Sequence, residues 1–239
     1  MGGVKTGWRR VAAGVLAAIV AGGSARAQEV PPNTLTEPEK AAGWKLLFDG
    51  QTTAGWRAYD ADSMPAGWQA VDGALTRVGR AGDIITRESF RNFELSLEWK
   101  VAPQGNSGIF YRAALGSQAI YHSAPEYQVL DDAGHRDGVT PLTSAGSVYG
   151  LYPTPAGIVK LAGEWNTARI LVDRNYVEHW LNGILIKGYE LGGPDWLGRV
   201  AGSKFAAWPE YGKAPEGHLG LQDHGDRVAY RSIRIREIK

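Results

Sequence analysis

The sequence predicts an all-β protein, built as a single-domain antiparallel β-sandwich. Short segments in which apolar and polar residues alternate recur about every ten residues, and this period is typical of half-buried strands. Turn residues separate these segments, and the dipeptides Asp72-Gly73 and Asn182-Gly183 are typical of tight hairpins. No amphipathic stretch predicts a helix of more than two turns. We therefore expect two curved sheets that pack their apolar faces together, one of which keeps a polar concave face.

The expected strands follow one another in a regular order. The segment 93–101 alternates strictly and is the clearest strand, whereas 84–90 is short and could cross between the sheets. Two long connections, about 131–163 and about 190–216, contain Pro, aromatic and small residues, so we expect them to be ordered walls around a cleft. The other expected strands are 43–50, the hairpin 68–77, 109–112 after a turn at 105–108, 126–131, the meander 168–189, 217–225 and 228–238.

The first 27 residues have the features of a secretory signal peptide. A basic start precedes a short apolar run, and Ala25-Arg26-Ala27 fits a cleavage site. The apolar run is too short to span a bilayer comfortably, although an uncleaved anchor helix is the alternative interpretation. We expect a periplasmic or secreted protein, with a flexible lead-in at 28–41 and one domain at 42–239.

Charge and cysteine content exclude several classes of function. The signal segment holds four of the 26 Lys and Arg residues and no acid, so the mature chain has 22 basic against 25 acidic residues, a net charge near −3. Such a surface argues against binding to nucleic acid or to an anionic membrane. The chain has no Cys, which excludes disulfides and thiol catalysis. The oligomeric state is not predicted.

The segment 217–225 carries polar side chains along one face of a strand. Its leucines point to the core, whereas His218, Gln222 and His224 point to the other face. Gly220 lies between them without a side chain and leaves a gap. This face therefore resembles the floor of a polar groove.

A second strand, 126–131, repeats this arrangement. Glu126 and Gln128 face away from the apolar residues between them. If the two polar faces share one hollow, a carboxylate, two carboxamides and two imidazoles form a single site. Glu126 and His224 are then candidate catalytic residues. The other polar residues of these faces, which would bind substrate hydroxyl groups, are Gln128, Gln222 and His218.

Further residues outside these two strands could also contact a substrate. Arg112 could clamp or stack on a sugar, although an ion pair with a neighbouring strand explains it equally well. Asn106 shapes a turn and could also reach the cleft. Lys204 and Tyr211 lie in the second long connection and are candidate groups of a lid. His179 alternates with apolar residues, so we expect it to be structural.

The sequence contains no metal-binding motif. His, Asp and Glu residues do not occur at the spacings of zinc or EF-hand calcium sites. A divalent cation is nevertheless a candidate cofactor, because Asp131 and Asp132 could bind a hard cation through oxygen atoms together with Glu126.

Five segments of the chain occur in the order that is typical of one bacterial family. They are Trp44–Gly50 (WKLLFDG), Asn106–Arg112 (NSGIFYR), Glu126–Asp131 (EYQVLD), Glu178–Gly183 (EHWLNG) and Leu221–Gly225 (LQDHG). Together they resemble the bacterial 3-keto-disaccharide hydrolase family from about residue 42 to 238. The resemblance implies a jelly roll of the concanavalin-like (lectin/glucanase) type and action on glycosides whose sugar carries a ketone at C3.

A ketone at C3 makes cleavage by elimination feasible, because it acidifies the hydrogen on C2. A base would remove that proton, the enolate would expel the aglycone from C1, and water would then add. Glu126 or His224 would be the base, and Arg112, Gln128 or a cation would hold the oxyanion. The glucanase pattern Glu-x-Asp-x-x-Glu is absent, so paired-carboxylate hydrolysis is not expected. The alternative function is a non-catalytic carbohydrate-binding module.

Overall fold

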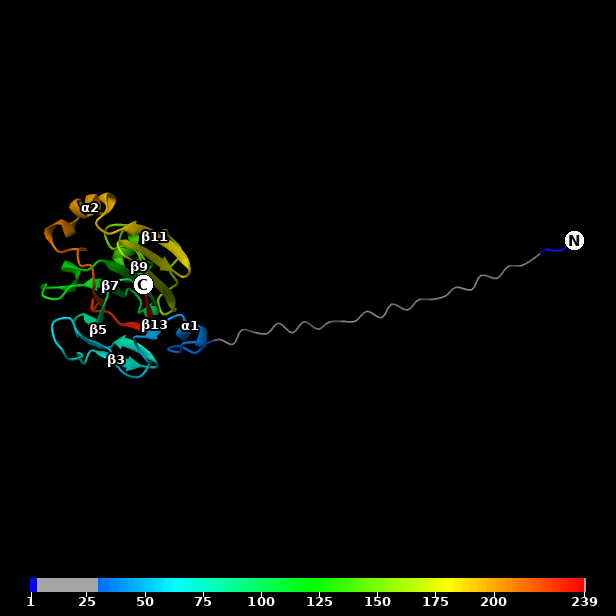
Figure 1. Ribbon diagram of the computed structural model, residues 1–239, viewed down its shortest axis with the longest axis horizontal. Helices are drawn as coiled ribbons and strands as arrows, with labels where there is room; N and C mark the ends of the chain where they lie inside the picture. The colour runs from blue at the N-terminus through cyan, green and yellow to red at the C-terminus, as the bar shows by residue number, and fades with distance from the viewer. Residues whose placement is uncertain (4–29, 239) are drawn as a thin grey trace.

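The computed structural model of the protein describes residues 1–3 and 30–238, so the expected signal peptide falls outside the described residues apart from its first three positions. Two antiparallel sheets pack against each other around one hydrophobic core (Figure 1). The all-β sandwich expected from the sequence is confirmed. Among the described residues, we find no helix that combines the length and the apolar character needed to cross a membrane.

The larger sheet has eight strands. They are β1 (Lys45–Leu46), β3 (Trp68–Val71), β4 (Ala74–Arg77), β6 (Phe93–Val101), β9 (Asn166–Asp173), β10 (Tyr176–Leu181), β11 (Ile184–Glu190) and β13 (Val228–Glu237). In space they run β11-β10-β9-β6-β13-β4-β3, and β1 pairs with β13. The expected hairpin becomes β3 and β4, and the expected meander becomes β9, β10 and β11.

The smaller sheet has five strands and carries the polar face. They are β2 (Trp56–Ala58), β5 (Ile84–Phe90), β7 (Asn106–Ala113), β8 (Glu126–Leu130) and β12 (Gly217–Leu221), in the spatial order β2-β5-β12-β7-β8. The helical segments are α1 (Glu37–Ala41), α2 (Pro194–Ala201) and the short 3-10 turns η1 (Ile120–His122), η2 (Arg136–Val139) and η3 (Lys204–Ala207). Figure 1 shows α2 beyond the sheet edge formed by β11.

Strict alternation in β6 builds the centre of the core. Phe93, Leu95, Leu97, Trp99 and Val101 are all at most 3% exposed. Burying a large apolar side chain stabilises a fold by about 1.5–3 kcal/mol, so this one strand contributes substantially. The neighbouring segment 84–90 does not cross between sheets, because it is β5 and pairs with β2 and β12 within the smaller sheet.

The described part of the lead-in is more structured than the sequence analysis expected. Thr36 and Glu39 form a capping box that starts α1. Asn33 ties this segment to the domain, because its side chain donates a hydrogen bond to the Gly73 carbonyl and accepts one from the Ser232 N–H, both of 2.8 Å. The Thr-x-x-Glu spacing was a readable signal for this helix.

A small second apolar cluster covers part of the polar face. Ile120 and Ala124 from the η1 segment pack on Ile85 of β5 and Phe110 of β7. A Cβ atom on Gly220 would collide with the Ile120 side chain. The gap expected at Gly220 is therefore filled by η1, and the open part of the face lies toward β8.

Candidate active site

A pocket of about 400 Å³ lies where β7, β8 and β12 adjoin, on the side of the smaller sheet that faces away from the main core. It brings Glu126, from β8, and His224, from the turn after β12, to one cavity. Side chains from both long connections complete its wall. The lining residues are Asn106, Tyr121, Glu126, Gln128, Tyr149, Lys204, Phe205, Trp208, Gln222 and His224.

The register of β7 and β8 makes room for the Glu126 carboxyl group. Gly108 lies opposite Gln128, and Phe110 lies opposite Glu126. A Cβ atom on Gly108 would collide with Oε1 of Glu126. The glycine in the Asn-Ser-Gly segment is therefore a requirement of the site, because the carboxyl group lies across the neighbouring strand at this position.

Glu126 is buried without a compensating hydrogen bond. The residue is 7% exposed, and none of the hydrogen bonds among the described residues involves its carboxyl oxygens. Burial raises the pKa of Glu126 to about 8, the Lys204 ammonium lowers it, and the carboxylates of Asp83 and Asp137 raise it further. The group is thus largely protonated at neutral pH and becomes a competent base in mildly alkaline solution.

Three carboxamides surround this carboxyl group with unused acceptors. The Gln128 amide donates to the Thr143 carbonyl at 3.1 Å, which directs its oxygen elsewhere. Among the described residues, the side-chain oxygens of Asn106, Gln128 and Gln222 are buried without a hydrogen-bond partner. A buried acceptor without a partner costs about 1–3 kcal/mol. A ligand with several hydroxyl donors would satisfy these atoms.

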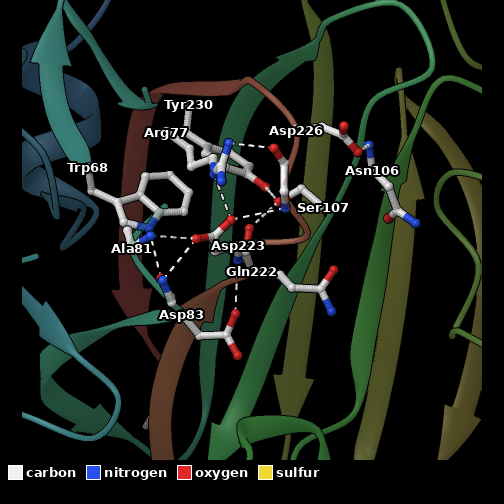
Figure 2. A network of polar contacts seen from close by, with 12 residues as sticks. Trp68, Arg77, Ala81, Asp83, Asn106, Ser107, Gln222, Asp223, Asp226 and Tyr230 are labelled. Atoms are coloured by element: carbon white, nitrogen blue, oxygen red, sulfur yellow. Dashed lines mark hydrogen bonds and ion pairs between the residues drawn. The ribbon is translucent and has the colours of Figure 1, made fainter. Parts of the chain in front are cut away.

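The neighbour of Gln222 along the chain, Asp223, points into a structural network and not into the pocket. Its carboxylate accepts hydrogen bonds from the N–H groups of Ala81 and Gly82, both at 2.8 Å, and pairs with Arg77 Nε at 2.6 Å. Burial raises the pKa of Asp223, but these donors outweigh it and the pKa is lowered. Figure 2 shows Gln222 extending away from this network. The network fixes the backbone that presents Gln222.

His224 lies at the open side of the pocket and is exposed. Its ring lies 6.2 Å from the ring of His135, measured between centroids at an interplanar angle of 81°. The Nδ1 atom of His135 accepts the Asp137 N–H at the start of η2. The first long connection therefore approaches the pocket beside His224.

Arg112 does not reach the pocket. A left-handed backbone conformation (φ 53°) interrupts the alternation of β7 at this residue. Its guanidinium donates to the carbonyl of Arg91 at 3.1 Å and to that of Arg174, and the residue is only 4% exposed. The arginine thus ties the β5–β6 and β9–β10 connections to β7, which is neither the sugar clamp nor the ion pair that the sequence suggested.

His218 also lies outside the pocket lining, because a register shift after it breaks the alternation of β12. Its Nδ1 atom lies 2.8 Å from the Thr86 carbonyl. Tyr211, expected on a lid, is 3% exposed and stacks on Phe205 and Trp196, with ring centroids 4.2 and 5.7 Å away. Tyr211 thus supports the pocket residue Phe205 from behind, whereas His218 is held against the backbone of β5.

Asp131 and Asp132 do not converge with Glu126. Asp131 Oδ2 accepts the Gln104 N–H, and Asp132 Oδ1 accepts the Ala145 N–H, both at 2.8 Å. In the part of the chain that the structure covers, no group of three or more His, Cys, Asp or Glu side chains is arranged to hold a metal ion. The cation ligand set expected from the sequence is therefore not formed.

His179 is a core residue. It is fully buried, and its ring lies between the Tyr111 hydroxyl, 3.0 Å from Nε2, and the Gly146 carbonyl, 3.2 Å from Nδ1. Burial lowers the pKa of His179 to about 4, so the ring is neutral at physiological pH.

Sequence reasoning missed the aromatic part of the pocket. Tyr121 comes from η1, Tyr149 from the first long connection, and Phe205 and Trp208 from the second. The Lys204 ammonium lies over the Tyr149 ring, 4.4 Å from its centroid. Aromatic residues inside long connections were the available signal, but nothing in a single sequence shows which of them face a cavity.

Comparison with known proteins identifies the family. A model of the 3-keto-alpha-glucoside-1,2-lyase-like domain matches residues 43–236. The chain belongs to this family. A 3-keto-disaccharide hydrolase of Bacteroides thetaiotaomicron is 36% identical over 236 residues, which cover 85% of this chain and 81% of the relative.

Solved structures support the same relationship. A crystal structure of a Parabacteroides distasonis protein described as a glycosyl hydrolase is 35% identical, with a TM-score of 0.83, and the alignment covers 87% of this chain and all of that one. A second protein so described from that organism is 28% identical with a TM-score of 0.65, over 82% of this chain and 99% of its own. The protein is therefore a carbohydrate-acting enzyme of the hydrolase class, and a purely binding module is not supported.

Proposed function

We propose that the protein cleaves the glycosidic bond of 3-keto-glucosides by elimination and hydration, with Glu126 as the base. One observation carries the proposal: among the described residues, Glu126 is the only Asp or Glu that lines the pocket. A retaining or inverting glycosidase needs two carboxyl groups, about 5–9.5 Å apart. A sugar with a ketone at C3 needs one base, because the ketone stabilises the carbanion formed at C2. The name of the Bacteroides relative supports the same substrate class.

The proposed reaction proceeds in three steps. Ionised Glu126 takes the proton from C2, and the electron pair of the C–H bond moves through C2–C3 onto the ketone oxygen, forming an enolate. The enolate collapses to a C1–C2 double bond while the C1–O bond breaks, and the aglycone leaves with that electron pair and takes up a proton. Water then adds across the double bond and gives the free 3-keto-sugar.

The pocket residues fit these steps. Burial gives the base a pKa of about 8, which suits proton abstraction in mildly alkaline solution. The Lys204 ammonium is the positive group that would stabilise the enolate oxygen, an effect worth about 3–4 kcal/mol for a well-placed donor. His224, at the open side, would protonate the departing oxygen. The carboxamides of Asn106, Gln128 and Gln222 would bind sugar hydroxyls.

We separately propose that the pocket binds a divalent cation; the three steps above do not depend on it. Carboxamide oxygens are among the ligands that hard cations accept, so Asn106, Gln128 and Gln222 would hold one beside the Glu126 base, in place of Asp131. The ion would supply positive charge for the enolate oxygen. Dialysis against EDTA followed by addition of Mg²⁺ or Mn²⁺ tests it. Loss and recovery of activity would support a cation, and unchanged activity would contradict it.

The main test compares p-nitrophenyl 3-keto-glucoside with the unoxidised glucoside. We expect release of nitrophenol from the ketone alone, and a slower rate when C2 carries deuterium. Glu126→Gln and His224→Ala should each lower the rate by about 10²–10⁴. Glu190→Gln, at the exposed end of β11, is the matched control and should retain it. Equal cleavage of both glucosides, or full activity of Glu126→Gln, would contradict the proposal.

We also propose that the protein acts in the periplasm or outside the cell, from the signal-like residues 1–27. Cell fractionation and N-terminal sequencing test this. A mature chain that begins at Gln28 in the periplasm or medium is expected, and an uncleaved cytoplasmic chain would contradict it.

A further inference from the structure

The pocket has two chemically different halves. The floor, formed by strand residues and the turn after β12, consists of Glu126, Asn106, Gln128, Gln222 and His224, which all have polar heads. The opposite wall comes from η1 and the η3 segment and consists of aromatic side chains: Tyr121, Phe205 and Trp208. We call these two parts the polar floor and the aromatic wall.

The aromatic wall is held in place by contacts between the two loops that build it. The His122 ring stacks on Trp208, with centroids 4.6 Å apart and an interplanar angle of 29°. Tyr121 meets Trp208 edge-on at 5.3 Å. A backbone hydrogen bond of 2.8 Å from Gly212 to the Ser123 carbonyl joins the loops. The Trp208 ring is thus oriented before any ligand binds.

We propose that Trp208, with Tyr121, forms the subsite for the leaving group and selects leaving groups that present a flat apolar face. This inference rests on the proposed function, which places the reacting sugar at Glu126. That sugar carries the hydroxyl donors that the polar floor requires. The group on the other side of the scissile bond therefore meets the aromatic wall, where His122 covers one face of Trp208 and the other face stacks on the ligand.

Two kinds of leaving group share this chemistry. An aryl ring stacks on indole through its π face, and a pyranose stacks through its C–H face. A methoxy group presents no such face. For each substrate, the kcat/KM of the variant is divided by that of the wild type. This ratio cancels the differences in intrinsic leaving ability between substrates, so it reports only the contribution of the flat face of the leaving group.

The experiment uses methyl, p-nitrophenyl and glucosyl 3-keto-glucosides with wild type, Trp208→Leu and Trp208→Phe. Trp208→Leu should lower kcat/KM by about tenfold for an aryl or glucosyl leaving group and by much less for methoxy, and Trp208→Phe should restore most of the loss. If kcat/KM falls only for the p-nitrophenyl substrate, the subsite selects an aryl leaving group. If it falls for the glucosyl substrate, the subsite accepts a sugar. Trp165→Leu is the matched control, because this half-buried Trp lies against Lys100 and Arg231 on the larger sheet.

Binding separates this inference from the proposed function. Titration calorimetry with Glu126→Gln protein measures the affinity of intact methyl and p-nitrophenyl 3-keto-glucosides without turnover, and Trp208→Leu in that background should remove the preference for the aryl compound. Equal losses for all ligands, or none, would overturn the subsite. Absence of turnover by the wild type would overturn the proposed function alone.

Discussion

The burial of Glu126 makes a quantitative prediction about stability. Glu126→Gln keeps the shape of the side chain and cannot ionise. In the folded protein the pKa of Glu126 is raised from the ordinary 4.5 to about 8, mainly by burial. Between these two values the folded chain holds a proton that the unfolded chain has released. The free energy of unfolding of the wild type therefore falls as the pH rises through this window and levels off above about pH 8.

The size of this effect follows from the shift. Each unit of pKa is worth about 1.36 kcal/mol, so a rise from 4.5 to about 8 amounts to about 5 kcal/mol. Glu126→Gln removes this pH dependence. Relative to wild type, the variant should gain nothing near pH 4 and should be more stable by up to about 5 kcal/mol at pH 9.

Urea denaturation at several pH values between about 4 and 9 measures this difference. Glu190→Gln is the matched control, and because Glu190 is exposed it should follow the wild type throughout. The reasoning would be refuted if the stability difference between Glu126→Gln and wild type did not grow with pH. In that case the carboxyl group would be solvated or paired in the folded protein, and its burial would no longer support its role as the base.

Three further predictions test the surroundings of Glu126. The Lys204 ammonium lowers the pKa of Glu126, so Lys204→Met should move the midpoint of the pH profile of kcat/KM to higher pH. An unmoved midpoint would show that Lys204 does not influence the pKa of Glu126. Gly108→Ala sets a methyl group against the carboxyl, and should cost about 1–3 kcal/mol in urea denaturation together with most of the activity; a fully active variant would contradict this. Asp223→Ala leaves Arg77 Nε and the N–H groups of Ala81, Gly82 and Gly225 without their acceptor, and should destabilise by about 3 kcal/mol; a loss below about 0.5 kcal/mol would show that the network is solvated.

The fold was accessible from the sequence where alternation is regular. The nine residues 93–101 are buried at every second position and form β6 with the expected bounds. The capped helix α1 was missed, because Pro31-Pro32 and polar residues dominate that segment and its capping box spans only four residues. The strand expected at 43–50 shortens to Lys45–Leu46, because after Leu46 the chain continues in an irregular segment.

The site could be predicted only in part, because the alternation of apolar and polar residues identifies a strand but not the segments that cover it. The sequence placed Glu126, Gln128 and Gln222 on polar faces, and all three line the pocket. His218 was assigned to the same face and Arg112 to substrate contact, but a register shift and a left-handed residue turn them elsewhere. Interruptions of this kind depend on tertiary packing, so they cannot be recognised from the apolar–polar alternation of the sequence.

The position of Glu126 argues for chemistry and against a structural role. A buried carboxyl group without a hydrogen-bond partner lowers stability at every pH above its unfolded pKa, and the amide of glutamine would avoid that cost. The sheet nevertheless accommodates it, through a glycine on β7 that gives up side-chain packing at that point. Three carboxamide oxygens around it also lack partners among the described residues. Such a cluster, destabilising when empty, becomes favourable once a polyhydroxylated ligand supplies the donors and a C–H acid supplies the proton.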